Sequence, residues 1–128
     1  MRTVVALSLF LVACTSAMST GSGQSVMLTA APSGTRVMLT LMNHGDSPIG
    51  YNLCTSGLQR RDPNDWVDVR TDEVCTMELR TLQPGATATF EKTLPANLTP
   101  GTYRYVTSVE QPVGGGHVVV ATDSFKAG

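Results

Sequence analysis

Two cysteines, Cys54 and Cys75, constrain the fold of this 128-residue chain more than any other feature. They lie in a stretch, residues 51–79, that reads as strand, turn, strand, turn, strand. If the chain is exported, such a pair favours a disulfide. A bridge over roughly twenty residues would stabilise the fold by about 3 kcal/mol through the loop entropy of the unfolded chain. Two buried free thiols are the alternative.

The N-terminal residues indicate export. Arg2 supplies a positive charge, and residues 4–13 form an apolar run with a single polar residue, Ser8. The run is too short to cross a bilayer as a mature helix. A basic start followed by a short apolar run is typical of a signal peptide, which does not take part in the mature fold.

The end of this run, Leu11-Val12-Ala13-Cys14, resembles the lipobox of bacterial lipoproteins. The resemblance implies that residues 1–13 are a lipoprotein signal peptide and that Cys14 is lipidated and holds the protein to a membrane. Thr15, where inner-membrane lipoproteins often have Asp, implies the outer membrane if the bacterium is Gram-negative. Ordinary signal cleavage after Ala17 is the alternative, and it would leave an unlipidated exported protein.

Lipidation of Cys14 would account for the odd cysteine of the three in the chain. Cys54 and Cys75 would then remain as a pair, which supports the disulfide hypothesis. Residues 14–25 are small, polar and rich in Ser and Gly, so they predict a flexible lipid tether. Residues 26–128 are expected to fold as one domain.

Short runs with strand character recur from residue 26 onward, separated by turns rich in Gly, Pro, Asn and Asp. Apolar residues alternate in 35–42, and Tyr103, Tyr105, Thr107 and Val109 share one face of 103–110. The pattern predicts an all-β sandwich of about 7–9 short strands, with a small β-barrel as the alternative. Trp66 is expected to pack in the core beside the two cysteines. The expected strands are 26–30, 35–42, 49–54, 58–61, 66–69, 74–79, 87–94, 103–110 and 118–125.

Two similar turns precede strands: Leu82-Gln83-Pro84-Gly85 and Leu98-Thr99-Pro100-Gly101-Thr102-Tyr103. Together with the turn that follows Leu39-Thr40-Leu41-Met42-Asn43, they resemble bacterial immunoglobulin-like domains over about residues 26–126. The resemblance implies an immunoglobulin-like β-sandwich with Tyr103 as the corner tyrosine. Antibody domains join the second and sixth strands by a disulfide, whereas the strand beginning at Tyr103 has no Cys. Antigen-receptor function therefore does not carry over.

The charge of the chain excludes one class of partner. A net charge of −1, with only 15% charged residues, provides no electrostatic field that would attract nucleic acid.

The sequence predicts a lipid-anchored cell-envelope module with a binding or structural role and no cofactor. Another envelope protein or a glycan is the expected partner.

Metal binding is one alternative function. Met42-Asn43-His44 resembles the Met/His ligands of periplasmic copper proteins, and thioether and imidazole groups suit copper. A cupredoxin-type site would also need a Cys closely followed by a His, and neither Cys54 nor Cys75 has one. An acidic run in 62–73 could hold Ca²⁺, but interleaved arginines favour a solvated hairpin instead.

Catalysis and inhibition are the remaining alternatives. The chain has no Gly-x-Ser-x-Gly motif, and its two histidines lie beside glycines in expected loops, so no enzyme is predicted. An exported proteinase inhibitor would present a loop to an active site. Candidate loops are 55–57 and 113–117, although the three glycines of the second argue against the rigidity that inhibition needs.

Overall fold

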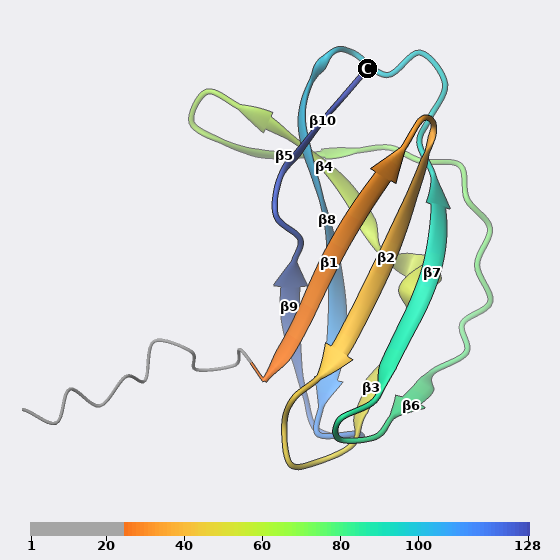
Figure 1. The fold of residues 1–128 in the computed structure, drawn as a ribbon, viewed down its shortest axis with the longest axis vertical. Helices are drawn as coiled ribbons and strands as arrows, with labels where there is room; N and C mark the ends of the chain where they lie inside the picture. The colour runs from red at the N-terminus through yellow and green to blue at the C-terminus, as the bar shows by residue number, and fades with distance from the viewer. Residues whose placement is uncertain (1–24) are drawn as a thin grey trace, which may run out of the picture.

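The computed structural model describes residues 25–128 as two β-sheets that share one hydrophobic core (Figure 1). The predicted signal peptide, Cys14 and the predicted tether up to residue 24 lie outside the described residues. None of the helical segments in 25–128 has the length and apolar character of a membrane span. The elements are β1 (Val26–Ser33), β2 (Arg36–Asn43), β3 (Ile49–Tyr51), η2 (Leu53–Thr55), β4 (Gly57–Asp62), β5 (Asp65–Val69), β6 (Arg80–Leu82), β7 (Thr87–Thr93), β8 (Gly101–Gln111), β9 (Gly116–Ala121) and β10 (Phe125–Ala127).

The smaller sheet has the order β1-β2-β7, with both pairings antiparallel. Alternation along β2 places Val37, Leu39 and Leu41 on the buried face, as the sequence predicts. The β1–β2 hairpin turns at Gly34, whose φ of +61° suits a residue without a Cβ. Burial of this apolar face against the larger sheet is the main driving force for the sandwich.

The larger sheet is organised around β8, its longest strand. One side of β8 pairs with β4 and, through Gly50 and Glu110, with β3. The other side pairs with β9 and β10. The β4–β5 hairpin projects at the upper end in Figure 1, whereas β1 begins near the lower end.

Two buried tyrosines on β8 differ in how their hydroxyl groups are satisfied. The Tyr103 hydroxyl donates a hydrogen bond to the carbonyl of Thr99, four residues earlier, in the connection that leads into β8. The Tyr105 ring stacks on Phe125, with 6.1 Å between ring centroids, but its buried hydroxyl has no hydrogen-bond partner among residues 25–128. A buried polar atom without a partner lowers stability.

Asn43 joins the lower ends of both sheets. Its buried amide Nδ2 donates to the carbonyls of Ser47 and Leu82, both at 3.0 Å, and its Oδ1 accepts from the Gly45 N–H. One side chain thereby satisfies backbone groups in the β2–β3 turn and at the end of β6. Where the backbone near the core is no longer part of a strand ladder, its N–H and C=O groups need hydrogen bonds of this kind from side chains.

The all-β sandwich is confirmed, but three predicted strands differ from the observed elements. The predicted strand 74–79 is wrong, because these residues are tied to η2, which offers no ladder partner, and pairing with β3 begins only at Arg80. The predicted strand 49–54 ends at Tyr51, and the chain turns into η2. The predicted strand 118–125 is split into β9 and β10 by Thr122, whose side-chain Oγ1 accepts from the Tyr105 N–H at 3.0 Å in place of a backbone carbonyl.

The two β8 tyrosines predict opposite responses to loss of the hydroxyl. Tyr103→Phe leaves the Thr99 carbonyl without its donor and should lower the free energy of unfolding by about 1–2 kcal/mol. Tyr105→Phe removes an unpaired buried hydroxyl and should leave the stability unchanged or raise it by about 1 kcal/mol. Urea denaturation at pH 7 measures both values. Equal destabilisation by the two variants would contradict the assignment.

Candidate functional site

The most distinctive surface feature is the segment from Arg70 to Leu79, which joins β5 to β6 and is called the strap below. In Figure 1 it runs from the upper to the lower part of the molecule, beside β7 at the edge of the sandwich. Residues 70–79 belong to no strand or helix. The strap therefore owes its position to side-chain attachments rather than to a hydrogen-bonded ladder.

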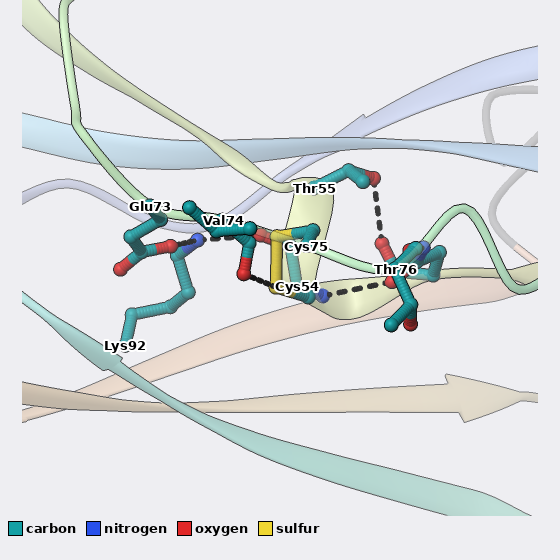
Figure 2. The surroundings of a disulfide bond; sticks show 8 residues. Cys54, Thr55, Glu73, Val74, Cys75, Thr76 and Lys92 are labelled. Carbon is teal, nitrogen blue, oxygen red and sulfur yellow. Dashed lines mark hydrogen bonds and ion pairs between the residues drawn. A yellow bond between two sulfur atoms is a disulfide. The ribbon is translucent and has the colours of Figure 1, made fainter.

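A disulfide holds the middle of the strap. Cys75 is bonded to Cys54 of η2, with 5.7 Å between their Cα atoms (Figure 2). Asn52 caps η2, because its Oδ1 accepts from the Cys54 N–H at 3.2 Å. The same side chain donates from Nδ2 to the Thr76 carbonyl at 2.7 Å, so the residue after Cys75 is fixed as well.

A buried lysine holds the strap two residues before the disulfide. Lys92 lies on the inward face of β7, and its side chain is 2% exposed. Its Nζ forms an ion pair with the Glu73 carboxylate and donates to the Cys54 carbonyl at 2.7 Å (Figure 2). A buried ammonium is costly without such partners, so Lys92 strongly favours the conformation in which Glu73 and η2 lie together.

The same ammonium and carboxylate lie close to Tyr105. The Lys92 Nζ is 5.9 Å from the centroid of the Tyr105 ring and 5.9 Å from that of Phe90. Burial, and to a smaller extent the negative charge of the Glu73 carboxylate, together raise the pKa of Tyr105 from 10.0 to about 12. The phenol therefore stays neutral over the whole physiological range.

The outward side of the strap is apolar and exposed. Val74 is 96% exposed and Met77 is 90% exposed, values that exceed those of the other large hydrophobic residues exposed in 25–128. Leu79, which is 51% exposed, packs at the base of the strap, where a Cβ on Gly50 would come within 3.0 Å of its Cδ2. The strap presents these side chains to solvent while its attachments limit how far it can move.

A shallow pocket of about 160 Å³ lies between the strap and the sandwich. Its walls come from η2, β3, β7 and Arg80 of β6, and from the strap residues Thr76 and Glu78. Thr76 and Glu78 thus border the pocket, with the Glu78 side chain 63% exposed, whereas Met77 between them does not border it and is 90% exposed. This period of two is characteristic of an extended chain.

Trp66, expected in the core, instead lies half-buried on β5 and outside the hydrophobic core. The Arg104 guanidinium lies 4.3 Å from the Trp66 ring centroid, and that of Arg61 lies 5.4 Å away. Arg61 is the direct cross-strand partner of Trp66, so the two share the outer face of the larger sheet. The prediction failed because Trp66 has the opposite alternation parity from Val69, which packs against the core.

The copper candidates Met42 and His44 lie at the end of β2. Met42 pairs with Met27 across the β1–β2 ladder, and His44 is exposed in the following turn. A separate group of potential ligand atoms in 25–128, from Cys54, Glu73 and Cys75, lies within 4.8 Å. Its two sulfurs are bonded to each other and are therefore not available as thiolate ligands. Copper binding at Met42 and His44 stays a prediction.

The two loops expected of an inhibitor offer one exposed large apolar side chain, Val113, which is 42% exposed. In 55–57, Ser56 is buried and Gly57 begins β4. In 113–117, the Gly114 N–H donates to the Glu110 carboxylate and the Gly115 N–H to the Pro112 carbonyl, which closes a tight turn.

The sequence analysis did not identify the strap as a separate segment, because its apolar residues resemble those of a strand. Lys92 has the same alternation parity as the inward-facing Phe90. This parity was the sequence signal that the lysine would be buried and would need a partner.

The coupling of Lys92 to Glu73 predicts a non-additive mutant cycle. Glu73→Ala leaves a buried ammonium without its counter-ion and should cost about 2 kcal/mol of stability, a value reduced because the Glu73 side chain is 28% exposed. In a Lys92→Met background, Glu73→Ala should cost close to nothing. Urea denaturation of the four proteins measures the coupling. An equal cost of Glu73→Ala in both backgrounds would contradict it.

The raised pKa of Tyr105 predicts a loss of stability at alkaline pH. Since the folded state holds the phenol proton to about pH 12 and the unfolded state releases it near pH 10, the contribution is complete below pH 10 and is lost between pH 10 and 12. The loss is roughly 2–3 kcal/mol. It appears as the difference in unfolding free energy between the natural protein and Tyr105→Phe, measured from pH 8 to 12. A difference independent of pH would contradict the shift.

Comparison with known proteins identifies the family. A structural-genomics target, SoR45, superposes with a TM-score of 0.51 at 15% identity over 79% of this chain and 81% of its own. A Bordetella pertussis protein designated ApaA superposes with a TM-score of 0.51 at 19% identity over 80% and 88%. Both are similar in fold, and no curated protein matches the chain significantly. The model of the bacterial Ig-like domain family matches residues 25–125, and the chain belongs to that family.

Proposed function

We propose that this bacterial Ig-like domain is a non-catalytic binding module of the cell envelope, anchored by lipid on Cys14, which binds another envelope protein through the strap. The observation that carries the proposal is the near-complete exposure of Val74 and Met77 on a segment that is fixed to the sandwich. Large apolar side chains gain about 1.5–3 kcal/mol each when they move from water into a partner. A pre-fixed segment also loses little conformational entropy on binding.

A protein partner fits this surface better than a glycan. Sugars commonly need an aromatic ring with a free face, and the half-buried Trp66 already has the Arg104 guanidinium 4.3 Å from its centroid. Arg104 is itself held by the Gln59 Oε1 at 2.8 Å, so stacking of a sugar would have to break an existing network. The aliphatic residues of the strap instead suit an apolar protein cleft.

The position of the strap is compatible with a lipid anchor. The tether would join the domain at the start of β1, and β2 separates β1 from β7 in the smaller sheet. The strap runs along the β7 side of that sheet (Figure 1). A membrane contact near β1 would therefore leave Val74 and Met77 accessible to a neighbouring protein.

Photocrosslinking in the cells that make the protein tests this function. A photoreactive residue at position 77 should give a discrete crosslinked species in the membrane fraction, identifiable by mass spectrometry as an envelope protein. The matched control is the same residue at Met38, an exposed methionine on the outer face of β2. A crosslinking pattern at 77 that equals the pattern at 38 would refute binding through the strap.

The anchor is tested in the same cells. Cys14→Ser should move the protein from the membrane fraction to the soluble exported fraction, because acyl chains supply the membrane affinity. Intact-mass analysis of the natural protein should show loss of residues 1–13 and added acyl chains. A mass that corresponds to an unlipidated chain starting at residue 18 would refute the lipid anchor and would indicate an exported protein without one.

A further inference from the structure

We propose that the strap is a substrate-like inhibitory segment for a serine endopeptidase with an apolar specificity pocket, and that Met77 is the side chain that enters that pocket. The inference rests on the proposed function, because it names the class of partner that the same segment binds. Four features of the strap support it: extended shape, fixation on both sides of Met77, the chemistry of Met77, and the tethering of both potential cleavage products.

The strap presents Met77 as a substrate would. Endopeptidases bind peptides in an extended form by strand addition, with alternate side chains placed in pockets. Thr76 and Glu78 border the pocket beneath the strap, whereas Met77 between them does not border it and is 90% exposed. Residues 70–79 are in no ladder, so the backbone around Met77 is not committed to a strand of this domain.

Attachments lie on both sides of Met77. On its N-terminal side, Cys75 is bonded to Cys54 and the Thr76 carbonyl accepts from Asn52 Nδ2 at 2.7 Å. On its C-terminal side, Arg80 begins β6 and pairs with Tyr51 of β3. Three residues, 77–79, thus separate the fixed points Thr76 and Arg80, and Met77 is the more exposed of the two large apolar side chains among them. Such preorganisation raises affinity by lowering the entropy lost on binding.

The Met77 side chain selects the class of pocket. It is unbranched, apolar and flexible, so it fills a deep apolar pocket and offers nothing to an acidic one. Val74 is equally exposed, but it precedes the disulfide, and its β-branched side chain is stiff. Met77 is therefore the residue best suited to enter a specificity pocket.

Tethering of both products explains why the strap would inhibit rather than be consumed. The enzyme's serine Oγ attacks the carbonyl carbon of Met77, the bond to the Glu78 nitrogen breaks, and that nitrogen takes the proton held by the enzyme's base. Cys75 and β6 would keep the new ends close together. The Glu78 amine can then attack the acyl ester, re-form the peptide bond and return the proton to the serine. Peptidases that use water directly form no acyl-enzyme, so this scheme requires a peptidase with a nucleophilic side chain, here a serine.

Titration of the detergent-solubilised full chain against chymotrypsin, subtilisin and trypsin tests the inference. We expect stoichiometric inhibition of chymotrypsin and subtilisin but not of trypsin. Met77→Gly should weaken inhibition by at least about 30-fold, the loss typical of a buried interface side chain. Met77→Lys should transfer inhibition to trypsin. The matched control Met38→Lys, on the outer face of β2, should change neither.

The role of the disulfide gives a second readout. With Cys54 and Cys75 reduced, chymotrypsin should cleave the Met77–Glu78 bond to completion, because the product ends can separate. Complete cleavage with the disulfide intact, or absence of inhibition of both apolar-specific enzymes, would overturn the inference. A specific crosslink from position 77 to an envelope protein that is not a peptidase would also overturn it while leaving the binding function in place. Absence of that crosslink would instead refute the binding function.

Discussion

The contact of the Lys92 ammonium with the Glu73 carboxylate and the Cys54 carbonyl fixes the relation between the sandwich and its strap. The ammonium comes from β7 of the smaller sheet, whereas its partners belong to η2 and to the strap that leads into β6 of the larger sheet. An ion inside a core is costly unless every donor finds a partner. The lysine thereby disfavours arrangements of the strap that an apolar residue at position 92 would tolerate.

The disulfide and the ion pair act on neighbouring residues by different physical means. The bond between Cys54 and Cys75 limits the unfolded chain to conformations that keep a loop of 21 residues closed. The Lys92–Glu73 pair acts only in the folded state, where the surrounding core weakens screening by water. The Cys54 Sγ also lies 3.9 Å from the Val74 carbonyl, and because a disulfide sulfur carries no hydrogen this is a packing contact.

Much of the sandwich could be predicted from sequence because alternation fixes which face of a strand is buried. β2 and β8 alternate without interruption, and their inward residues are those expected. The strap could not be predicted, since Val74, Met77 and Leu79 have the composition of a strand and only the tertiary partner decides whether a ladder forms. The prediction that Trp66 lies in the core was wrong for a related reason. A large aromatic residue favours burial, but its alternation parity on β5 places Trp66 with Arg61 on the outer face. The burial of Lys92 could not be predicted either, because it depends on Glu73 and Cys54, which are distant in sequence and are brought to it by the fold.

The central place of β8 has a consequence for the order in which this domain can fold. Its neighbours β3 and β4 are made long before it, and the hydrogen bond between Arg104 and Gln59 spans 45 residues. Until β8 has been synthesised, β3 can pair only with β6 and β4 only with β5, and the strand that joins these two pairs into one sheet is missing. Such non-local pairing slows folding. A chain of this topology keeps its first half without a finished core during synthesis.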